Sequence, residues 1–118
     1  MKLPSDGELL RIFIGESDKY EGRPLQEAVV EEARRQGLAG ATVLRGTLGF
    51  GANSRIHTAK ILRLSEDLPL VIEIVDKPER IAAFLPTLDA MMGEGLVTLE
   101  KVRIITYRHG SSPSASPT

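Results

Sequence analysis

Four stretches of the chain have the alternation of apolar and polar residues, or the short apolar run, that predicts a β-strand. They are residues 8–14, 41–48, 70–75 and 97–107. In the first stretch Leu10, Ile12 and Ile14 fall on one side, which predicts a half-buried strand. The third stretch is an almost continuous apolar run (LVIEIV) bounded by prolines, and this pattern is typical of a central strand.

Two further stretches repeat apolar residues every three or four positions, which predicts amphipathic helices. The first begins at Pro24 and ends at Gly37, because proline suits a first helical turn and glycine a C-terminal stop. Its apolar stripe consists of Leu25, Ala28, Val29 and Ala33. The second begins at Pro78 and ends at the glycines of residues 93–95, and Pro86 in its interior should kink it. Its stripe consists of Ile81, Phe84, Leu85, Leu88 and Met91.

The resulting order, β-α-β-β-α-β, is that of the ferredoxin-like sandwich. We therefore predict an α+β fold with a four-stranded antiparallel sheet, two helices on one face, and an extended loop or hairpin after the second strand. Apolar residues also point to the bare second face, so we expect this face to pack against another copy of the chain. We expect the domain to comprise residues 1–108, followed by a disordered Ser/Pro-rich tail over residues 109–118.

The composition excludes several classes of protein. Cysteine is absent, which excludes disulfides, thiolate metal sites and cysteine nucleophiles. No stretch resembles a signal peptide or has the roughly 20 apolar residues of a membrane helix, so we expect a cytoplasmic protein without direct membrane insertion. The pI of about 6.1 argues against bulk nucleic-acid binding. Phe13 is the only aromatic residue central to a predicted strand, so we expect no nucleic-acid partner.

The charges are segregated along the chain, although the net charge is only −1. Residues 33–65 contain basic residues but no carboxylate, and all sixteen acidic residues lie outside this interval. Within it, residues 49–54 (GFGANS) form a glycine-rich bend, where backbone N–H groups beside arginines suit an anion or a phosphate. A mobile hairpin that its charges keep soluble explains the same pattern.

The candidate anion-binding residues of this segment are Arg45, Arg55, His57, Lys60 and Arg63, and the last four also form a candidate docking loop for a partner. Asn53 opens a turn that either donates to a phosphate or has no role beyond the turn. We find no nucleophile paired with a base and no opposed carboxylates, so we predict no enzyme activity. The second histidine, His109, falls in the tail, so we also predict no metal site.

Three blocks of sequence resemble one family. They are residues 10–25 (LRIFIGESDKYEGRPL), 37–76 (GLAGATVLRGTLGFGANSRIHTAKILRLSEDLPLVIEIVD) and 91–105 (MMGEGLVTLEKVRII). They look like the uncharacterised PII-like proteins, which are relatives in fold of the nitrogen-regulatory PII signal transducers. The resemblance extends over residues 9–107. It implies a homotrimer with ligand clefts between its subunits and with mobile loops that reach a target protein.

The resemblance to PII proteins themselves is more distant and implies a nucleotide site. Their cleft holds ATP or ADP against a Gly-Phe-Gly turn, which Gly49, Phe50 and Gly51 match. Their usual targets are membrane transporters and metabolic enzymes. A transporter or an enzyme is therefore the class of partner that the resemblance implies.

The chain departs from PII proteins after its second predicted helix. PII proteins carry a glycine-rich phosphate loop there that ends in lysine, whereas residues 92–96 keep Gly93 and Gly95 without a lysine. Arg103 is a partial counterpart of the arginines near the PII C-terminus. A monophosphate, a smaller anion or no nucleotide is therefore as consistent with the sequence as a triphosphate.

The basic bend and the resemblance together predict a regulatory sensor. It would bind a small anionic effector between subunits and signal to its partner through the loop of residues 51–67. We expect no fixed cofactor, and an adenine nucleotide is the candidate effector. The alternative is a trimeric protein-interaction module with no nucleotide ligand.

Overall fold

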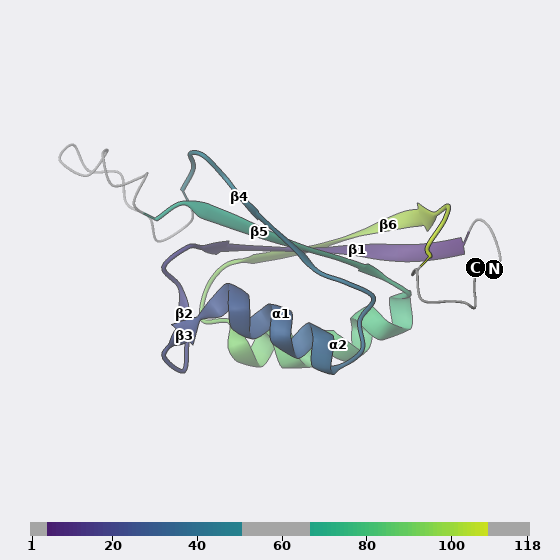
Figure 1. Cartoon of the computed structure of the whole chain (residues 1–118), viewed down its shortest axis with the longest axis horizontal. Helices are drawn as coiled ribbons and strands as arrows, with labels where there is room; N and C mark the ends of the chain where they lie inside the picture. Colours follow the sequence, from purple (N-terminus) through teal and green to yellow (C-terminus); the bar gives the residue numbers. More distant parts are fainter. Residues whose placement is uncertain (1–4, 51–66, 109–118) are drawn as a thin grey trace.

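The structure, a computed structural model, describes residues 5–50 and 67–108. Its main elements are β1 (Ser5–Gly15), α1 (Leu25–Arg35), β4 (Thr42–Arg45), β5 (Pro69–Asp76), α2 (Pro78–Met91) and β6 (Leu96–Ile104). The four strands form one antiparallel sheet in the order β4-β5-β1-β6. Both helices lie on the same side of this sheet (Figure 1). This is the ferredoxin-like arrangement that the order of elements predicted.

β1 is the centre of the fold, because β5 and β6 pair with it on either side over most of its length. Its residues Leu10, Ile12 and Ile14 are buried against the helices, as their alternation predicted. The same alternation in β5 buries Leu70, Ile72 and Ile74 beside them. The helices complete the core with Leu25, Ala28, Val29, Ala33, Ile81, Phe84, Leu88 and Met91.

The helix ends follow the predicted signals closely. Gly37 has a φ of +82° and follows α1, where the Leu38 N–H donates to the Ala33 carbonyl and closes the helix. At the other end Pro24 precedes the first helical residue and has extended backbone, with a ψ of 129°. Pro78 is the first residue of α2, and the helix continues across Pro86 to Met91.

Two predicted strands are shorter than expected. The stretch 41–48 forms a strand only over Thr42–Arg45. The Gly46 N–H still donates in register to the Pro69 carbonyl at 2.7 Å, but Pro69 has no N–H to return the bond, so the ladder stops there. The last strand ends at Ile104 instead of residue 107. The Tyr107 hydroxyl instead donates to the Ala39 carbonyl at 3.3 Å, beyond the end of the sheet.

The charged stretch after β1 contains a hairpin that the sequence pattern did not predict. The short strands β2 (Lys19–Tyr20) and β3 (Arg23–Pro24) pair antiparallel across Glu21 and Gly22. These two residues have φ values of +51° and +80°, as in the type I′ turns that join tight hairpins. The hairpin therefore depends on a glycine that can adopt positive φ.

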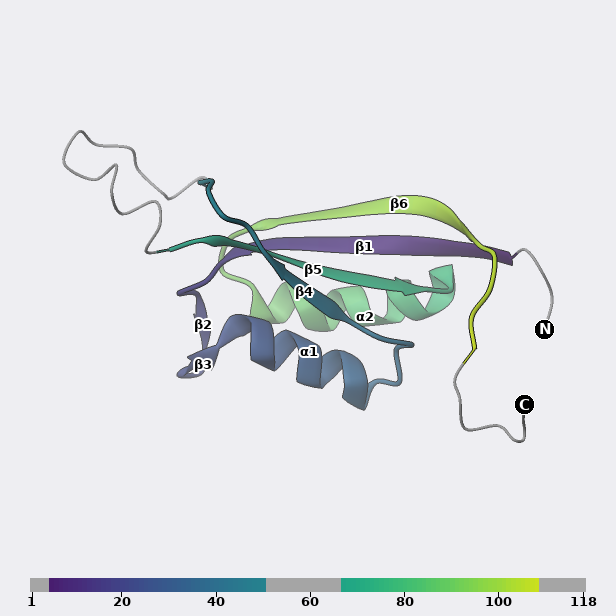
Figure 2. The same cartoon turned by 45° about the horizontal axis from the view of Figure 1, so that its top comes forward.

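One side of the sheet carries no described element, as Figure 2 shows. We call it the open face. By alternation and register its side chains include those of Leu9, Arg11, Phe13, Thr42, Leu44, Val71, Glu73, Val75, Leu96, Thr98 and Glu100. Four of them, Leu44, Val71, Phe13 and Leu96, are directly opposite one another and form one apolar row across all four strands. Leu44 is 49% exposed and Leu96 57% exposed, so both ends of the row are open to solvent in the described chain.

Asp76, at the end of β5, joins two turns at the opposite end of the sheet from residues 15–18. It is only 8% exposed, and its carboxylate accepts hydrogen bonds from the backbone N–H groups of Ala39 at 2.9 Å and Lys77 at 2.7 Å. It therefore holds the turn before β4 against the start of α2.

We predict that Asp76→Ala lowers the free energy of unfolding by about 3 kcal/mol, because two partly buried backbone N–H groups lose their charged acceptor. Urea denaturation monitored by circular dichroism would measure this change. The control is Asp89→Ala, which removes an exposed aspartate from α2 and should change the value by less than about 0.5 kcal/mol. Equal effects of the two variants would contradict the role given to Asp76.

Candidate ligand site at the end of the sheet

At the end of the sheet where β1 finishes, the residues that lead into β5 are attached to the turn that follows β1. The Glu16 N–H donates to the Leu68 carbonyl at 2.8 Å. The Ser17 N–H donates to Oδ1 of Asp67 at 2.9 Å. In the same turn Oδ2 of Asp18 accepts from the Gly15 N–H at 3.0 Å, which is the loop-capping role that its position favours. These bonds fix the point at which the chain enters β5.

Arg45, the last residue of β4, forms an ion pair with Glu16 at 2.7 Å between Nη2 and Oε2. The Arg45 side chain is 59% exposed and that of Glu16 32%. An anion can reach the guanidinium from solvent, but it would compete with this carboxylate. Residues 33–65 contain no carboxylate, but the fold therefore places the carboxylate of Glu16 beside an arginine of this interval.

The glycine bend begins beside this pair and packs on Pro69. A Cβ atom at Gly49 would lie 3.0 Å from Cγ of Pro69, so a side chain there would crowd the proline ring. Phe50, the next residue, is 64% exposed. Of the Gly-Phe-Gly turn, the structure therefore describes a close approach at Gly49 and an aromatic side chain open to solvent.

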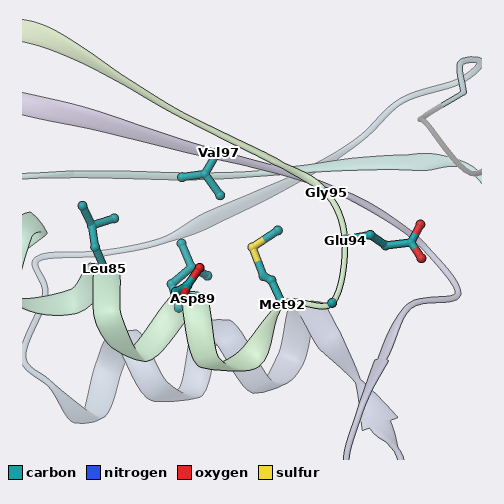
Figure 3. Close-up of a pocket in the computed structure, with 8 residues that line it drawn as sticks. Leu85, Asp89, Met92, Glu94, Gly95 and Val97 are labelled. Atoms are coloured by element: carbon teal, nitrogen blue, oxygen red, sulfur yellow. The ribbon is translucent and has the colours of Figure 1, made fainter.

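A cavity of about 340 Å³ lies between the end of α2 and the start of β6. Figure 3 shows Leu85, Met92 and Val97 projecting into it, with Asp89 on the helix. The remaining lining residues are Leu88, Gly93, Glu94 and Gly95. The described lining is thus an apolar floor with two carboxylates and no basic residue. Such a surface suits an apolar or aromatic group better than a phosphate.

Gly93 and Gly95 both line this cavity, but they differ in what they do there. Gly95 has a φ of +138°, and a Cβ atom on it would lie 2.7 Å from the Phe13 carbonyl oxygen. A Cβ atom on Gly93 would meet nothing within 4 Å. Gly95 is therefore required by the close approach to β1, whereas Gly93 is not constrained in this way.

Within one copy of the chain, Arg103 lies far in space from these two glycines. It pairs in register with Asp6, whereas Leu96, next to Gly95, pairs with Phe13. Seven residues of extended strand separate the two positions, a distance of roughly 23 Å. A single copy of the chain therefore does not bring Arg103 to the cavity.

The other predicted site residues, Gly51, Asn53, Arg55, His57, Lys60 and Arg63, lie outside the described residues. So does the predicted tail. Within residues 5–50 and 67–108, no group of three or more His, Asp or Glu residues could hold a metal ion. Over the same residues, neither helix is long and apolar enough to cross a membrane.

Sequence reasoning missed two parts of this site. Glu16 follows the first predicted strand, and nothing local indicates that it meets Arg45, which comes from another strand. Leu85 was placed in the apolar stripe of the second helix, and it lines the cavity together with Met92; both are partly buried and pack against the core. The available signal was their position at the end of the apolar stripe, next to a glycine pair.

Comparison with known proteins identifies the family. Residues 7–104 match the model of the family DUF190, described as "Uncharacterized ACR, COG1993". The chain belongs to the DUF190 family. A UPF0166 protein from Aquifex aeolicus (strain VF5) is 41% identical over 98 residues, which cover 83% of this chain and 92% of that protein.

Solved structures similar to this DUF190 chain have the PII-like fold. A putative PII-like signaling protein from Thermus thermophilus superposes with a TM-score of 0.61 at 18% identity, covering 88% of this chain and 94% of that one. CPII from Thiomonas intermedia, bound to ADP, AMP and acetate, has a TM-score of 0.56 at 17% identity, covering 86% and 90%. These likenesses and the family match confirm the predicted membership of an uncharacterised PII-like family.

We predict that Gly95→Ala destabilises the protein by about 2 kcal/mol or more, because the side chain is strained at positive φ and meets the Phe13 carbonyl. Gly93→Ala is the matched control, with an expected change within about 0.5 kcal/mol. Thermal and urea unfolding of both variants would test this difference. If Gly93→Ala were the more damaging, the roles of the two glycines would be reversed.

Proposed function

We propose that this protein is a PII-like regulator that assembles as a homotrimer and binds a small anionic effector, an adenine nucleotide, in clefts between its subunits. The effector state is passed through the 51–67 loop to a partner protein, a transporter or a metabolic enzyme. The observation that carries the proposal is the occurrence of a cavity and of the base of that loop at one end of a PII-like sheet.

Self-association is supported by the open face. Its apolar row runs across all four strands and is opposite the two helices of the described chain. Covering a leucine that is about half exposed contributes on the order of 1 kcal/mol, so covering the row contributes several. A second and third copy would supply matching rows.

Nucleotide binding is supported by the chemistry at the end of the sheet and by one fold neighbour. The cavity has the apolar lining that suits a base, while Arg45 lies on an edge strand at the same end. CPII, which shares the fold, binds ADP and AMP. Arg103, at the far end of its strand, can join such a site only from another subunit, which favours a cleft between copies.

One observation favours the alternative, an interaction module without a nucleotide. The described cavity lining has two carboxylates and no cation, and Arg45 is already paired with Glu16. The carboxylates of the cavity would repel a phosphate group, and Glu16 would compete with a phosphate group for Arg45. Binding experiments therefore decide between the two functions.

We predict that the chain self-associates and that Leu96→Asp raises the concentration of half-association at least about tenfold, because a charge replaces a residue of the covered row. Leu99→Asp is the matched control, since Leu99 is a similarly exposed leucine of the same strand that faces the other side. Sedimentation velocity over a concentration series would measure both. A wild-type chain that stays monomeric would exclude the assembly.

We predict that AMP, ADP or ATP stabilises the full-length protein. At 100 times its dissociation constant, such a ligand adds about 2.7 kcal/mol, which raises Tm by on the order of 10 °C. Arg45→Ala should weaken binding about tenfold, because it removes a charge-assisted bond to phosphate. Arg23→Ala is the control, since Arg23 forms a comparable exposed pair with Glu31 at 2.9 Å and does not line the cavity.

Thermal shift and calorimetric titration would test the nucleotide prediction. If no nucleotide stabilises a chain that nevertheless forms trimers, the adenine nucleotide is excluded as the effector and the interaction module is favoured. If a nucleotide binds equally well to Arg45→Ala and wild type, the ligand lies elsewhere than beside this arginine.

A further inference from the structure

A charged cluster lies in the middle of the open face. Arg11 of β1 is opposite Glu73 of β5 and Thr98 of β6, and Glu73 is opposite Thr42 of β4. These four residues form a polar row that runs directly beside the apolar row of Phe13. A face built only to be covered by apolar contact would not carry such a row at its centre.

Arg11 bridges two carboxylates on the strands that flank it. Its Nε lies 2.9 Å from Oε2 of Glu73, and its Nη1 lies 3.2 Å from Oε1 of Glu100. The hydrogen bond to Glu73 is the main cause that raises the pKa of the guanidinium. Glu73 is 31% exposed and Glu100 58%, so Glu100, on the edge strand, is the looser of the two partners.

The cluster has one positive and two negative groups, a net charge of −1. By strand alternation, no other described residue of the open face is charged, since Glu8 and Lys101 point to the helix side. Leu9 and Val75 continue the face on the far side of the cluster. The surplus carboxylate therefore has no second cation on this face among the described residues of its own chain.

We propose that the cluster of Arg11, Glu73 and Glu100 makes self-association of this chain dependent on pH, because covering the open face takes up a proton at the surplus carboxylate. The proposal rests on the self-association proposed above and adds its regulation. The partner is a second copy of the same chain, which brings its own surplus carboxylate to the shared interface.

The direction of the pH dependence follows from the loss of water around the charged cluster when the open face is covered. Covering the face removes water from a net negative charge, and several copies place such charges near one another. Uptake of a proton removes the penalty, so the assembled state binds more protons than the separated chains. Association is then strengthened as pH falls, tenfold in the association constant per pH unit for each proton taken up. It is weakened as pH rises.

Sedimentation velocity of the full-length wild-type protein at several concentrations, between about pH 5.5 and 8.5, would measure this dependence. The expected result is tighter association at the acidic end. Glu100→Gln leaves the Arg11–Glu73 pair balanced, so it should associate at least about tenfold more tightly than wild type at about pH 8.5 and lose most of the pH dependence.

The matched control is Glu27→Gln, which removes the same charge from the exposed side of α1. It should leave both the association and its pH dependence as in wild type. The proposal is overturned if Glu100→Gln keeps the wild-type pH dependence. It is also overturned if Glu27→Gln has the same effect, because net charge alone would then explain the result.

A second pair of variants tests the role of the arginine. Arg11→Met leaves two uncompensated carboxylates and should abolish association at about pH 8.5, whereas Arg11→Met with Glu73→Gln and Glu100→Gln should restore it without pH dependence. If the single variant does not fold, the triple variant still gives this measurement. A triple variant that remains monomeric, or that keeps the pH dependence, overturns the proposal.

Failure of this inference differs from failure of the proposed assembly. A wild-type chain that is monomeric at every pH would overturn both the proposed assembly and its dependence on pH. A chain that associates, and that Leu96→Asp dissociates, but that shows no dependence on pH or on Glu100, keeps the assembly and removes only the proton linkage.

Discussion

The alternation of side chains along β1 is the constraint on which the rest of the structure depends. One set of positions, Leu10, Ile12 and Ile14, is buried under the helices, and the set between them includes Arg11 and Phe13 on the open face. Because the side-chain period of a strand is two, a shift of one residue would exchange the two sets and bury a charge in the core. Pairing with strands on both sides makes such a shift more costly still.

The parts of the fold that could be predicted are those encoded locally. Apolar periodicity and terminal glycine or proline residues indicated the helices, and the end of α1 just before Gly37 fits the positive φ of that glycine. The length of β4 could not be read in this way, because it depends on the partner strand, where Pro69 has no N–H to return the bond that Gly46 donates. A bond between residues more than twenty positions apart has no signature in a local window of sequence.

The candidate site shows the same limit more strongly. The glycines at its rim were implied by the resemblance to the PII phosphate loop, but its ion pair joins Arg45 to Glu16, which lies in the turn after β1. Linear segregation of charge suggested an uncompensated basic segment. Antiparallel pairing instead places the end of β4 beside the turn after β1, which contains Glu16 and Asp18. Charge patterns along a chain therefore indicate a field only after the pairing of the strands is known.

β1 connects the two regions that the proposed function requires. Its open side carries the cluster at Arg11, and its end carries the turn that holds Arg45 and the start of β5. The carbonyl of Phe13 also limits the glycine turn at the cavity. β1 therefore brings the face proposed for assembly and the edge of the cavity together on one strand, which two neighbouring strands hold in place.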